Sequence, residues 1–225
     1  MKTIVYVDGY NLFYGCLKHT PFKWLDLYKL FVEQIIRVQD PALEVIQVKF
    51  FTADIKAKVA SNGQLASQAQ QSYHRALEAR YPEKIEIIKG YYSLEKAKLP
   101  IYINPPDKSQ GVDVWKLEEK ETDVNIALTA YRDVVKGNAE HIVFVSNDTD
   151  IFPALQAIRE DYDGNVHIGV IIPVRQHENA RPANAKLSNY ADWTRKYITT
   201  KELESSQLPN TIPTKKKPIK KPEYW

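Results

Sequence analysis

The stretch Ile142–Ile151, IVFVSNDTDI, decides the fold. Four consecutive apolar residues of the strand-forming type begin it, and a helical pattern starts at its last residue, so it predicts a buried strand, a tight turn and a helix. Asp148 and Asp150 then follow a strand in the middle of a sheet, where open α/β sheets bind their ligands. A structural role for each stays open, because Asp148 can close an Asx turn and Asp150 can cap the helix.

The composition fits one sizeable folded domain. The chain has 225 residues, of which 44% are hydrophobic, enough to bury a core. The single cysteine, Cys16, excludes an internal disulfide framework and a cysteine-based zinc site. The start, MKTIVYVDGY, lacks the features of a signal peptide, and no apolar run reaches the roughly 20 residues that span a bilayer. We therefore expect a cytoplasmic protein without a membrane partner.

The formal net charge of +3 is concentrated near the end of the chain. Residues 208–225 contain five lysines against Glu223, a net charge of +4, which leaves −1 for residues 1–207. A nearly neutral body lacks the basic field of a stable DNA-binding module. The lysines can contact a phosphate locally or only keep the segment solvated. We divide the chain into a domain, residues 1–200, and a basic, Pro- and Lys-rich C-terminal extension, residues 201–225, that packs on the domain.

Strands and helices alternate along the domain. We predict a helix broken at Pro21 and ended by Pro41, three further helices at 61–80, 118–136 and 151–162, and strands at 3–7, 45–52, 85–90, 142–145 and 166–172. This alternation indicates a parallel sheet with right-handed crossovers. Residues 91–113 interrupt it as an inserted loop or hairpin. Its tyrosines and lysines can contact a substrate, or the tyrosines can simply pack.

Carboxylates recur where the predicted strands end. Asp8 follows the first strand, and Asp123 opens the helix that leads to the strand before Asp148. Each has a structural alternative, Asp8 as a turn residue and Asp123 as a favourable charge at a helix N-terminus. A doubly wound sheet would bring them to one rim, where a hard divalent cation relieves their repulsion. Oxygen ligands suit Mg²⁺ or Mn²⁺, ions that polarise a phosphate and activate water in phosphodiester hydrolysis.

Three motifs on these residues resemble those of the NYN domain, a branch of the PIN-like nucleases, and in particular its bacterial LabA-like members. They are Val7–Asn11 (VDGYN), Glu119–Ala127 (EKETDVNIA) and Ser146–Asp150 (SNDTD), and the match spans roughly residues 1–175. The resemblance implies an α/β fold, a Rossmann-like three-layer sandwich of PIN type around a mostly parallel sheet. It also implies a metal-dependent endoribonuclease, a hydrolase of RNA. Its catalytic and metal-binding residues would be Asp8, Asp123, Asp148 and Asp150.

The polar neighbours of these aspartates are predicted to contact the substrate, namely Asn11, Lys120, Asn125, Ser146 and Thr149. The match departs at Glu121, where many members have glycine, and this adds a side chain and a negative charge beside Asp123. Gly111–Val114 imitates the same motif, but no apolar helical period follows it. Asp113 therefore ranks behind Asp123 as a site residue.

Two other functions compete with the nuclease. A catalytically silent member would bind RNA or a protein partner and use the acidic rim structurally. A phosphatase of the haloacid dehalogenase type needs a second aspartate two residues after the first, and Tyr10 stands there. The sequence thus favours RNA as the partner, and it is compatible with a homodimer.

Overall fold

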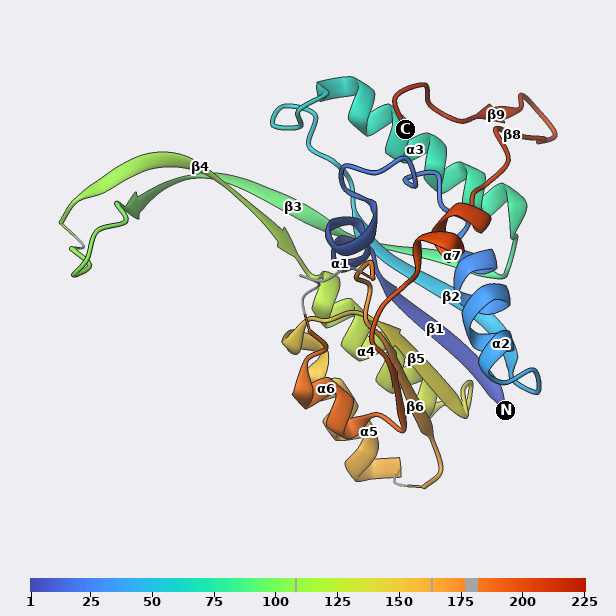
Figure 1. Ribbon diagram of the computed structural model, residues 1–225. Helices are drawn as coiled ribbons and strands as arrows, with labels where there is room; N and C mark the ends of the chain where they lie inside the picture. The colour runs from blue at the N-terminus through green and yellow to red at the C-terminus, as the bar shows by residue number, and fades with distance from the viewer. Residues whose placement is uncertain (108, 163, 177–181) are drawn as a thin grey trace.

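Seven strands form the central sheet of the computed structural model, in the order β4-β3-β2-β1-β5-β6-β7 (Figure 1). The structure describes residues 1–107, 109–162, 164–176 and 182–225. The strands are β1 (Lys2–Asp8), β2 (Glu44–Ala53), β3 (Ile85–Pro100), β4 (Gly111–Lys120), β5 (His141–Val145), β6 (His167–Ile171) and β7 (Trp193–Arg195). Neighbouring strands from β3 to β7 pair in parallel, whereas β3 and β4 pair antiparallel.

Helices connect these strands and cover both faces of the sheet. Their bounds are α1 (Gly9–Leu12), η1 (Phe13–Leu17), η2 (Lys29–Ile36), α2 (Arg37–Gln39), α3 (Gly63–Arg80), α4 (Thr122–Val135), η3 (Thr149–Ile151), α5 (Phe152–Tyr162), α6 (Ala185–Tyr190) and α7 (Thr200–Ser205). Alternate side chains of β1 enter different cores: Val5 and Val7 pack with the η2 and α3 side, and Ile4 and Tyr6 with the α4 and α5 side. The predicted three-layer α/β sandwich with a mostly parallel sheet is therefore confirmed.

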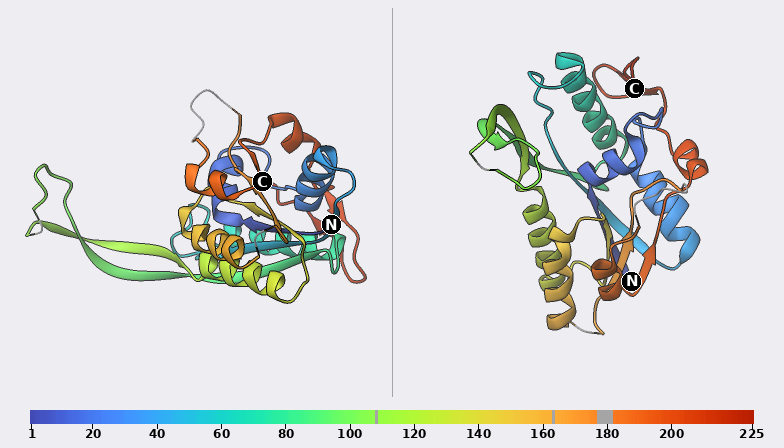
Figure 2. Two further views of the ribbon diagram at one scale, coloured as in Figure 1. Left: turned by 90° about the horizontal axis from the view of Figure 1, so that it is seen from below. Right: turned by 60° about the vertical axis from the view of Figure 1, so that its left-hand side comes forward.

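The largest departure from the predicted elements lies at residues 91–120, which we name the hairpin arm. The inserted segment is a hairpin, one of the two expected alternatives, but it is longer than predicted: the strand predicted at 85–90 continues to Pro100, and β4 returns antiparallel to it. The helix predicted from residue 118 begins at Thr122, because residues 118–120 still belong to β4. The hairpin arm leaves the body as a long two-stranded ribbon (Figures 1 and 2).

The C-terminal extension packs on the body through aromatic contacts. A short hairpin, β8 (Thr211–Ile212) with β9 (Ile219–Lys220), lies beside α3. The ring of Trp225 lies 6.4 Å from that of Trp24 and 5.4 Å from that of Tyr73. In Figure 1 the β8–β9 hairpin lies on the right of the body, whereas the hairpin arm leaves it on the left. Within the described residues, no helix is long and apolar enough to cross a membrane.

Candidate active site

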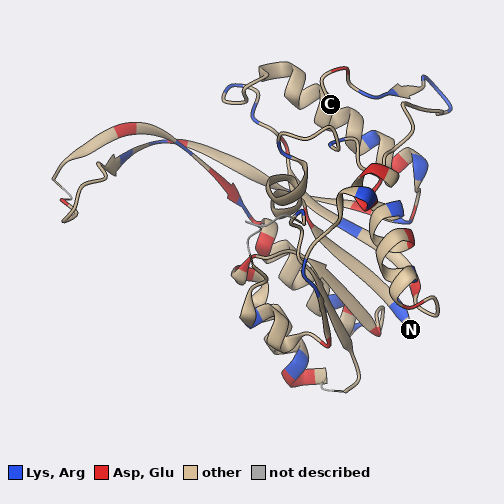
Figure 3. Cartoon of the chain, viewed as in Figure 1, with Lys and Arg blue, Asp and Glu red and all other residues tan. Residues whose placement is uncertain are grey.

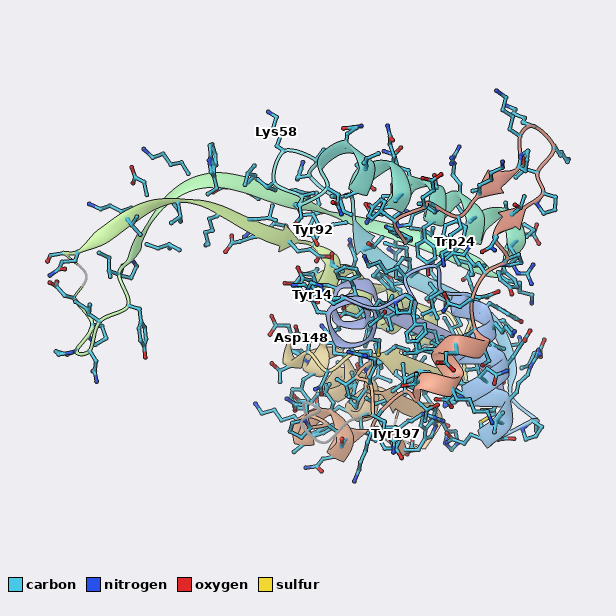
Figure 4. All side chains as sticks on the ribbon, turned by 45° about the horizontal axis from the view of Figure 1, so that its top comes forward. Tyr14, Trp24, Lys58, Tyr92, Asp148 and Tyr197 are labelled. Carbon is cyan, nitrogen blue, oxygen red and sulfur yellow. The ribbon has the colours of Figure 1, made fainter. Side chains whose placement is uncertain are left out.

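The sheet reverses its winding between β1 and β5. From β1 the chain adds β2 and β3 on one side, and from β5 it adds β6 and β7 on the other. Such a switch point opens a crevice at the carboxyl ends of the two strands. A cavity of about 220 Å³ lies there, lined by Asp8, Tyr10, Asn11, Tyr14, Tyr92, Leu117, Glu119, Thr122, Asp123 and Asp148. Figure 4 shows Tyr14, Tyr92 and Asp148 near one another beside the root of the hairpin arm.

A larger hollow of about 570 Å³ runs along α3 and β3. Its walls are mainly exposed polar side chains such as Gln68, Gln71 and Glu78. The smaller cavity instead gathers buried and half-buried carboxyls with raised pKa values, which is the usual signature of a functional site. We therefore assign the candidate active site to the cavity at the switch point.

Asp8 is the fixed centre of this cavity. It is almost fully buried at the end of β1, and its Oδ1 accepts a hydrogen bond from the Asn11 backbone N–H at 2.9 Å. Its Oδ2 accepts from Asn11 Nδ2 and from Ser146 Oγ, both at 2.7 Å. Burial raises the pKa of Asp8, while the hydrogen bonds from Asn11 and Ser146 oppose that rise. The network ties the carboxyl end of β1 to that of β5.

Asp148 has both of the roles that the sequence left open. Its Oδ1 accepts a hydrogen bond from the Asp150 backbone N–H at 3.1 Å, which caps η3, and its side chain also lines the cavity. Its own backbone N–H donates to Ser146 Oγ at 3.0 Å, so the turn is attached to Asp8 through Ser146. Thr149 and Asp150 are exposed and lie outside the cavity wall.

Asp123 is the carboxyl best suited to exchange a proton. It lies in the first turn of α4 and is half-buried. Burial, followed by the negative charges of Asp8, Asp148 and Asp150, raises its pKa from 3.8 to about 6. All four predicted aspartates therefore share one electrostatic environment. At neutral pH Asp123 is largely ionised, yet its pKa is close enough to the solution pH for it to accept a proton and release it again.

The structure adds cavity residues that the sequence analysis did not assign. Glu119, at the end of β4, accepts hydrogen bonds from Thr122 Oγ1 at 2.6 Å and from the Tyr92 hydroxyl at 3.3 Å, and burial raises its pKa. The rings of Tyr10 and Tyr14 lie 4.4 Å apart between centroids. Glu119 and Tyr10 stood inside quoted motifs, but only the path of β4 reveals that Glu119 and Tyr92 meet.

Of the five predicted substrate contacts, Asn11 lines the cavity, and the other four, Lys120, Asn125, Ser146 and Thr149, lie outside its wall. Lys120 is exposed and pairs with Glu118 at 2.7 Å, and Asn125 is half-buried one turn into α4. Asp113 is on the hairpin arm, paired with Lys96 at 2.9 Å. Glu121 has a φ of 72°, the left-handed region in which glycine is unstrained, and this explains why the resembling motif has glycine there.

The predicted Mg²⁺ or Mn²⁺ site is not assembled as a ligand set. Among residues 1–107, 109–162, 164–176 and 182–225, no three His, Cys, Asp or Glu side chains form a group that could hold a metal ion. Both oxygens of Asp8 already accept hydrogen bonds from Asn11 and Ser146. A divalent cation at these carboxylates therefore stays a prediction.

The alignment with one named relative covers the entire chain. The chain is 44% identical to 6-hydroxy-3-succinoylpyridine 3-monooxygenase HspA of Pseudomonas putida, over an alignment of 242 positions that covers 100% of this chain and 75% of the relative. The chain belongs to the family of this enzyme. It is accordingly an enzyme itself. No family model matches the sequence.

This relationship overturns the predicted function. The endoribonuclease and its hydrolase chemistry, together with the alternative of a catalytically silent RNA- or protein-binding module, are wrong, because the relative is a monooxygenase. The physical reason is that parallel strands of an α/β sheet all end at one rim, so carboxylates that follow those strands gather there whatever reaction the protein catalyses. The same rim serves unrelated reactions, so a likeness of fold and motif does not identify the chemistry.

A solved structure shows the same fold in another protein. The crystal structure of a protein of unknown function from Vibrio parahaemolyticus RIMD 2210633 has a TM-score of 0.51 and 20% sequence identity to this chain. The similarity covers 88% of this chain and 92% of the other. At this level of identity it supports the architecture alone.

Proposed function

We propose that this protein is a monooxygenase that oxidises a small hydroxylated pyridine carrying an acidic side chain. The observation that carries the proposal is the 44% identity to 6-hydroxy-3-succinoylpyridine 3-monooxygenase along the whole chain. The cavity supports it, because about 220 Å³ suits a single-ring substrate and its wall contains three tyrosine rings. Aromatic faces hold a flat heteroaromatic ring by stacking and edge contacts.

The carboxylates suit the polar groups of such a ring. A hydroxypyridine presents an O–H or N–H donor, and Asp8, Glu119 and Asp123 present acceptor oxygens on the cavity wall. In the relative's substrate, position 6 lies para to position 3 of the ring, where that enzyme acts. Removing the proton from the 6-hydroxyl increases the electron density at position 3, which favours attack by an electrophilic oxygen species. Because that carbon bears the succinoyl group, formation of the C–O bond requires that the C–C bond to this group break, and the acyl group leaves to water as a carboxylic acid. Asp123, with a pKa of about 6, is the group that would take this proton.

The acidic side chain of the substrate needs a positive charge, because the cavity itself is negative. Lys18 provides one: its Nζ lies 4.6 Å from the centroid of the Tyr14 ring, and Tyr14 lines the cavity. Lys18 is exposed, so it stands at the rim rather than in the interior. A substrate with its ring against Tyr14 and its carboxylate toward Lys18 would satisfy both charges.

Monooxygenation transfers one atom of O₂ to the substrate and reduces the other to water with two electrons from a reductant. A flavin is one group that supplies such electrons, but the cavity does not fit one beside a substrate. Its volume of about 220 Å³ is below the roughly 300–1,000 Å³ of sites that enclose larger ligands. The eight glycines of the chain also contain no G-x-G-x-x-G dinucleotide fingerprint.

The direct test uses isotopic oxygen. Purified protein is incubated under oxygen-18 gas with 6-hydroxy-3-succinoylpyridine and reduced nicotinamide nucleotide, with and without added flavin, and the product is analysed by mass spectrometry. We expect one labelled oxygen atom per product molecule. The matched control is Lys215→Gln, an exposed lysine of the C-terminal extension, which should react normally. Product labelled from oxygen-18 water instead of the gas, or no product with any of these reductants, would contradict the proposal.

A further inference from the structure

The hairpin arm exposes several large apolar side chains. Tyr102 is 100% exposed, Trp115 71%, Val112 51% and Leu117 45%. The arm is only two strands wide beyond Gly90, since β4 is the edge of the sheet and pairs with β3 alone. A two-stranded ribbon is marginally stable in water unless another layer covers it. Apolar side chains concentrated on such a ribbon mark an interaction surface.

The register places apolar side chains on both faces of the ribbon, among charged ones. Directly opposed residues share a face. On one face, Leu94 is opposite Leu117, and Trp115 follows next to Lys96 toward the tip. On the other face, Ala97 is opposite Val114 and Leu99 is opposite Val112. The body therefore cannot cover the arm by lying against one side of it, and Figure 2 shows that the arm projects away from the body.

We infer that the hairpin arm is the dimerisation element of this protein and that it packs against the arm of a second copy. The charge of the arm favours this partner. Residues 91–120 contain five lysines, with Lys108 counted from the sequence alone, and five carboxylates, so their net charge is zero. The two signs alternate along the ribbon (Figure 3). Nucleic acids and anionic membranes would instead require an excess of positive charge.

The free edge of β4 fits the same partner. Ten residues, Gly111–Lys120, have backbone groups on their outer side that no strand of the described chain pairs with. A second copy presents an identical edge and an identical pair of apolar faces. A twofold axis would place the two β4 edges side by side, so that the unpaired backbone groups and apolar side chains of each copy meet those of the other, as in isologous interfaces. This inference is independent of the proposed function.

The arm also connects this interface to the cavity. Tyr92, Leu117 and Glu119 belong to the arm and line the cavity wall. Leu117 continues on the same ribbon face into Trp115. A second copy packed on that face would lie beside the entrance of the cavity.

The test is the mass of the protein in solution, measured by light scattering over a range of concentrations. We expect the wild-type protein at twice the mass of one chain. Replacing one apolar residue on each face, Val112→Lys with Trp115→Lys, should yield a monomer with an unchanged circular dichroism spectrum. The matched controls Leu65→Lys and Leu128→Lys alter comparably exposed apolar residues of α3 and α4, and they should stay dimeric.

Hydrogen exchange supplies a second measurement without any substitution. Backbone amides of residues 111–120 should exchange more slowly as the protein concentration rises, whereas those of α3 should not change. A wild-type protein that is monomeric at every concentration overturns the inference. So does an arm variant that stays dimeric, or a control that dissociates, because each of these places the contact elsewhere.

Discussion

The central sheet and the hairpin arm share one strand, β3, whose two halves have different surroundings. From Ile85 to Gly90 the strand pairs in parallel with β2, and Ile85 is 6% exposed. From Tyr91 to Pro100 it pairs only with β4, whose Trp115 is 71% exposed. Helices cover the sheet on both faces, so β1 and β5 contain unbroken apolar runs. No helix of the described residues covers the arm, and charged residues alternate with its apolar ones. Whether helices cover a strand, more than the strand propensity of its residues, therefore determines which residues are favourable there.

The cavity lies where these two regions meet. The body supplies Asp8, Asp123 and Asp148, and the arm supplies Tyr92 and Glu119. Substitutions on either side of this boundary can separate what each region contributes. The predictions below follow that division, starting with the largest expected effect.

Asp123→Asn should nearly abolish turnover, by roughly 10²- to 10⁴-fold, because the amide cannot accept the substrate proton. The wild-type kcat/KM should rise with pH through about 6, the pKa of Asp123, and this limb should be absent from the variant. Steady-state kinetics over a pH series measures both. Glu119→Gln, on the arm side, should reduce turnover less and keep the limb. If Glu119→Gln instead removes the rise of kcat/KM with pH, then Glu119 on the arm, and not Asp123, is the base.

The same substitution should affect stability in the opposite direction. The pKa of Asp123 is raised by folding, so this group stabilises the fold most below its ordinary pKa of 3.8, and that contribution is lost as the pH rises through about 6. At pH 7 Asp123→Asn should therefore have a higher Tm than the wild type, and the difference should shrink as the solution is acidified below pH 4. A lower Tm at pH 7 would show that the carboxylate has a structural partner.

Gly90→Ala should disturb the junction between sheet and arm. A Cβ at this position would lie 2.3 Å from the Lys120 carbonyl oxygen and 2.7 Å from Thr122 Oγ1, so the backbone must move. We expect a loss of about 1–3 kcal/mol, typical of overpacking, measured by denaturant unfolding. Gly137→Ala is not a fair control because its φ is positive, whereas Gly90 has no such constraint. Ala97→Gly, farther out on the arm, serves better and should cost less. Equal losses for both would mean that the junction is not tightly packed.

Lys18→Gln should weaken binding of substrates with an acidic side chain. Losing one exposed charge-assisted contact should raise KM by about three- to tenfold and leave kcat nearly unchanged. Lys23→Gln is the control, a half-buried lysine whose Nζ lies 5.8 Å from the Tyr224 ring and which does not line the cavity. A substrate analogue without the carboxylate should not distinguish the variant from the wild type. If the analogue binds more weakly to the variant than to the wild type, Lys18 contacts the substrate ring and not its carboxylate.

Glu121→Gly has the smallest expected effect. Glu121 joins the arm to α4 with a φ of 72°, and glycine relieves that strain. We expect a gain of up to about 1 kcal/mol in the free energy of unfolding. Glu83, at a φ of 67° in a loop of the body, provides the comparison, and Glu83→Gly should gain a similar amount. A loss at Glu121 alone would show that its side chain has a role at the junction.

The body of the fold could be predicted because its signals are local. Apolar runs such as Ile142–Val145 identify buried strands, and the alternation of strands with helices dictates a parallel sheet. The convergence of Asp8, Asp123 and Asp148 followed from the same reasoning, since parallel strands end at one rim. Both the buried strands and the rim at which they end depend on the order of strands and helices, which can be read from the pattern of apolar residues.

The arm and the reaction could not be predicted in this way. The prolines of residues 91–113 indicated a loop or small hairpin, and only the pairing of β3 with β4 shows that the strand continues as far as Pro100. Glu118 and Glu119 suit a helix N-terminus as well as a strand, so the helix was predicted four residues too early. The prediction of a nuclease was wrong because the three motifs describe the rim of an α/β sheet, and such a rim can serve unrelated reactions.

The continuity of β3 has a mechanical consequence. The nine residues from Tyr92 to Pro100 extend the strand by roughly 26 Å beyond the part that pairs with β2. The same strand contains Tyr92, whose hydroxyl donates a hydrogen bond to Glu119 in the cavity wall. An antibody fragment that binds the distal end of the arm and shifts the ribbon should therefore change turnover, because it displaces Tyr92 and its contact with Glu119 in the cavity wall.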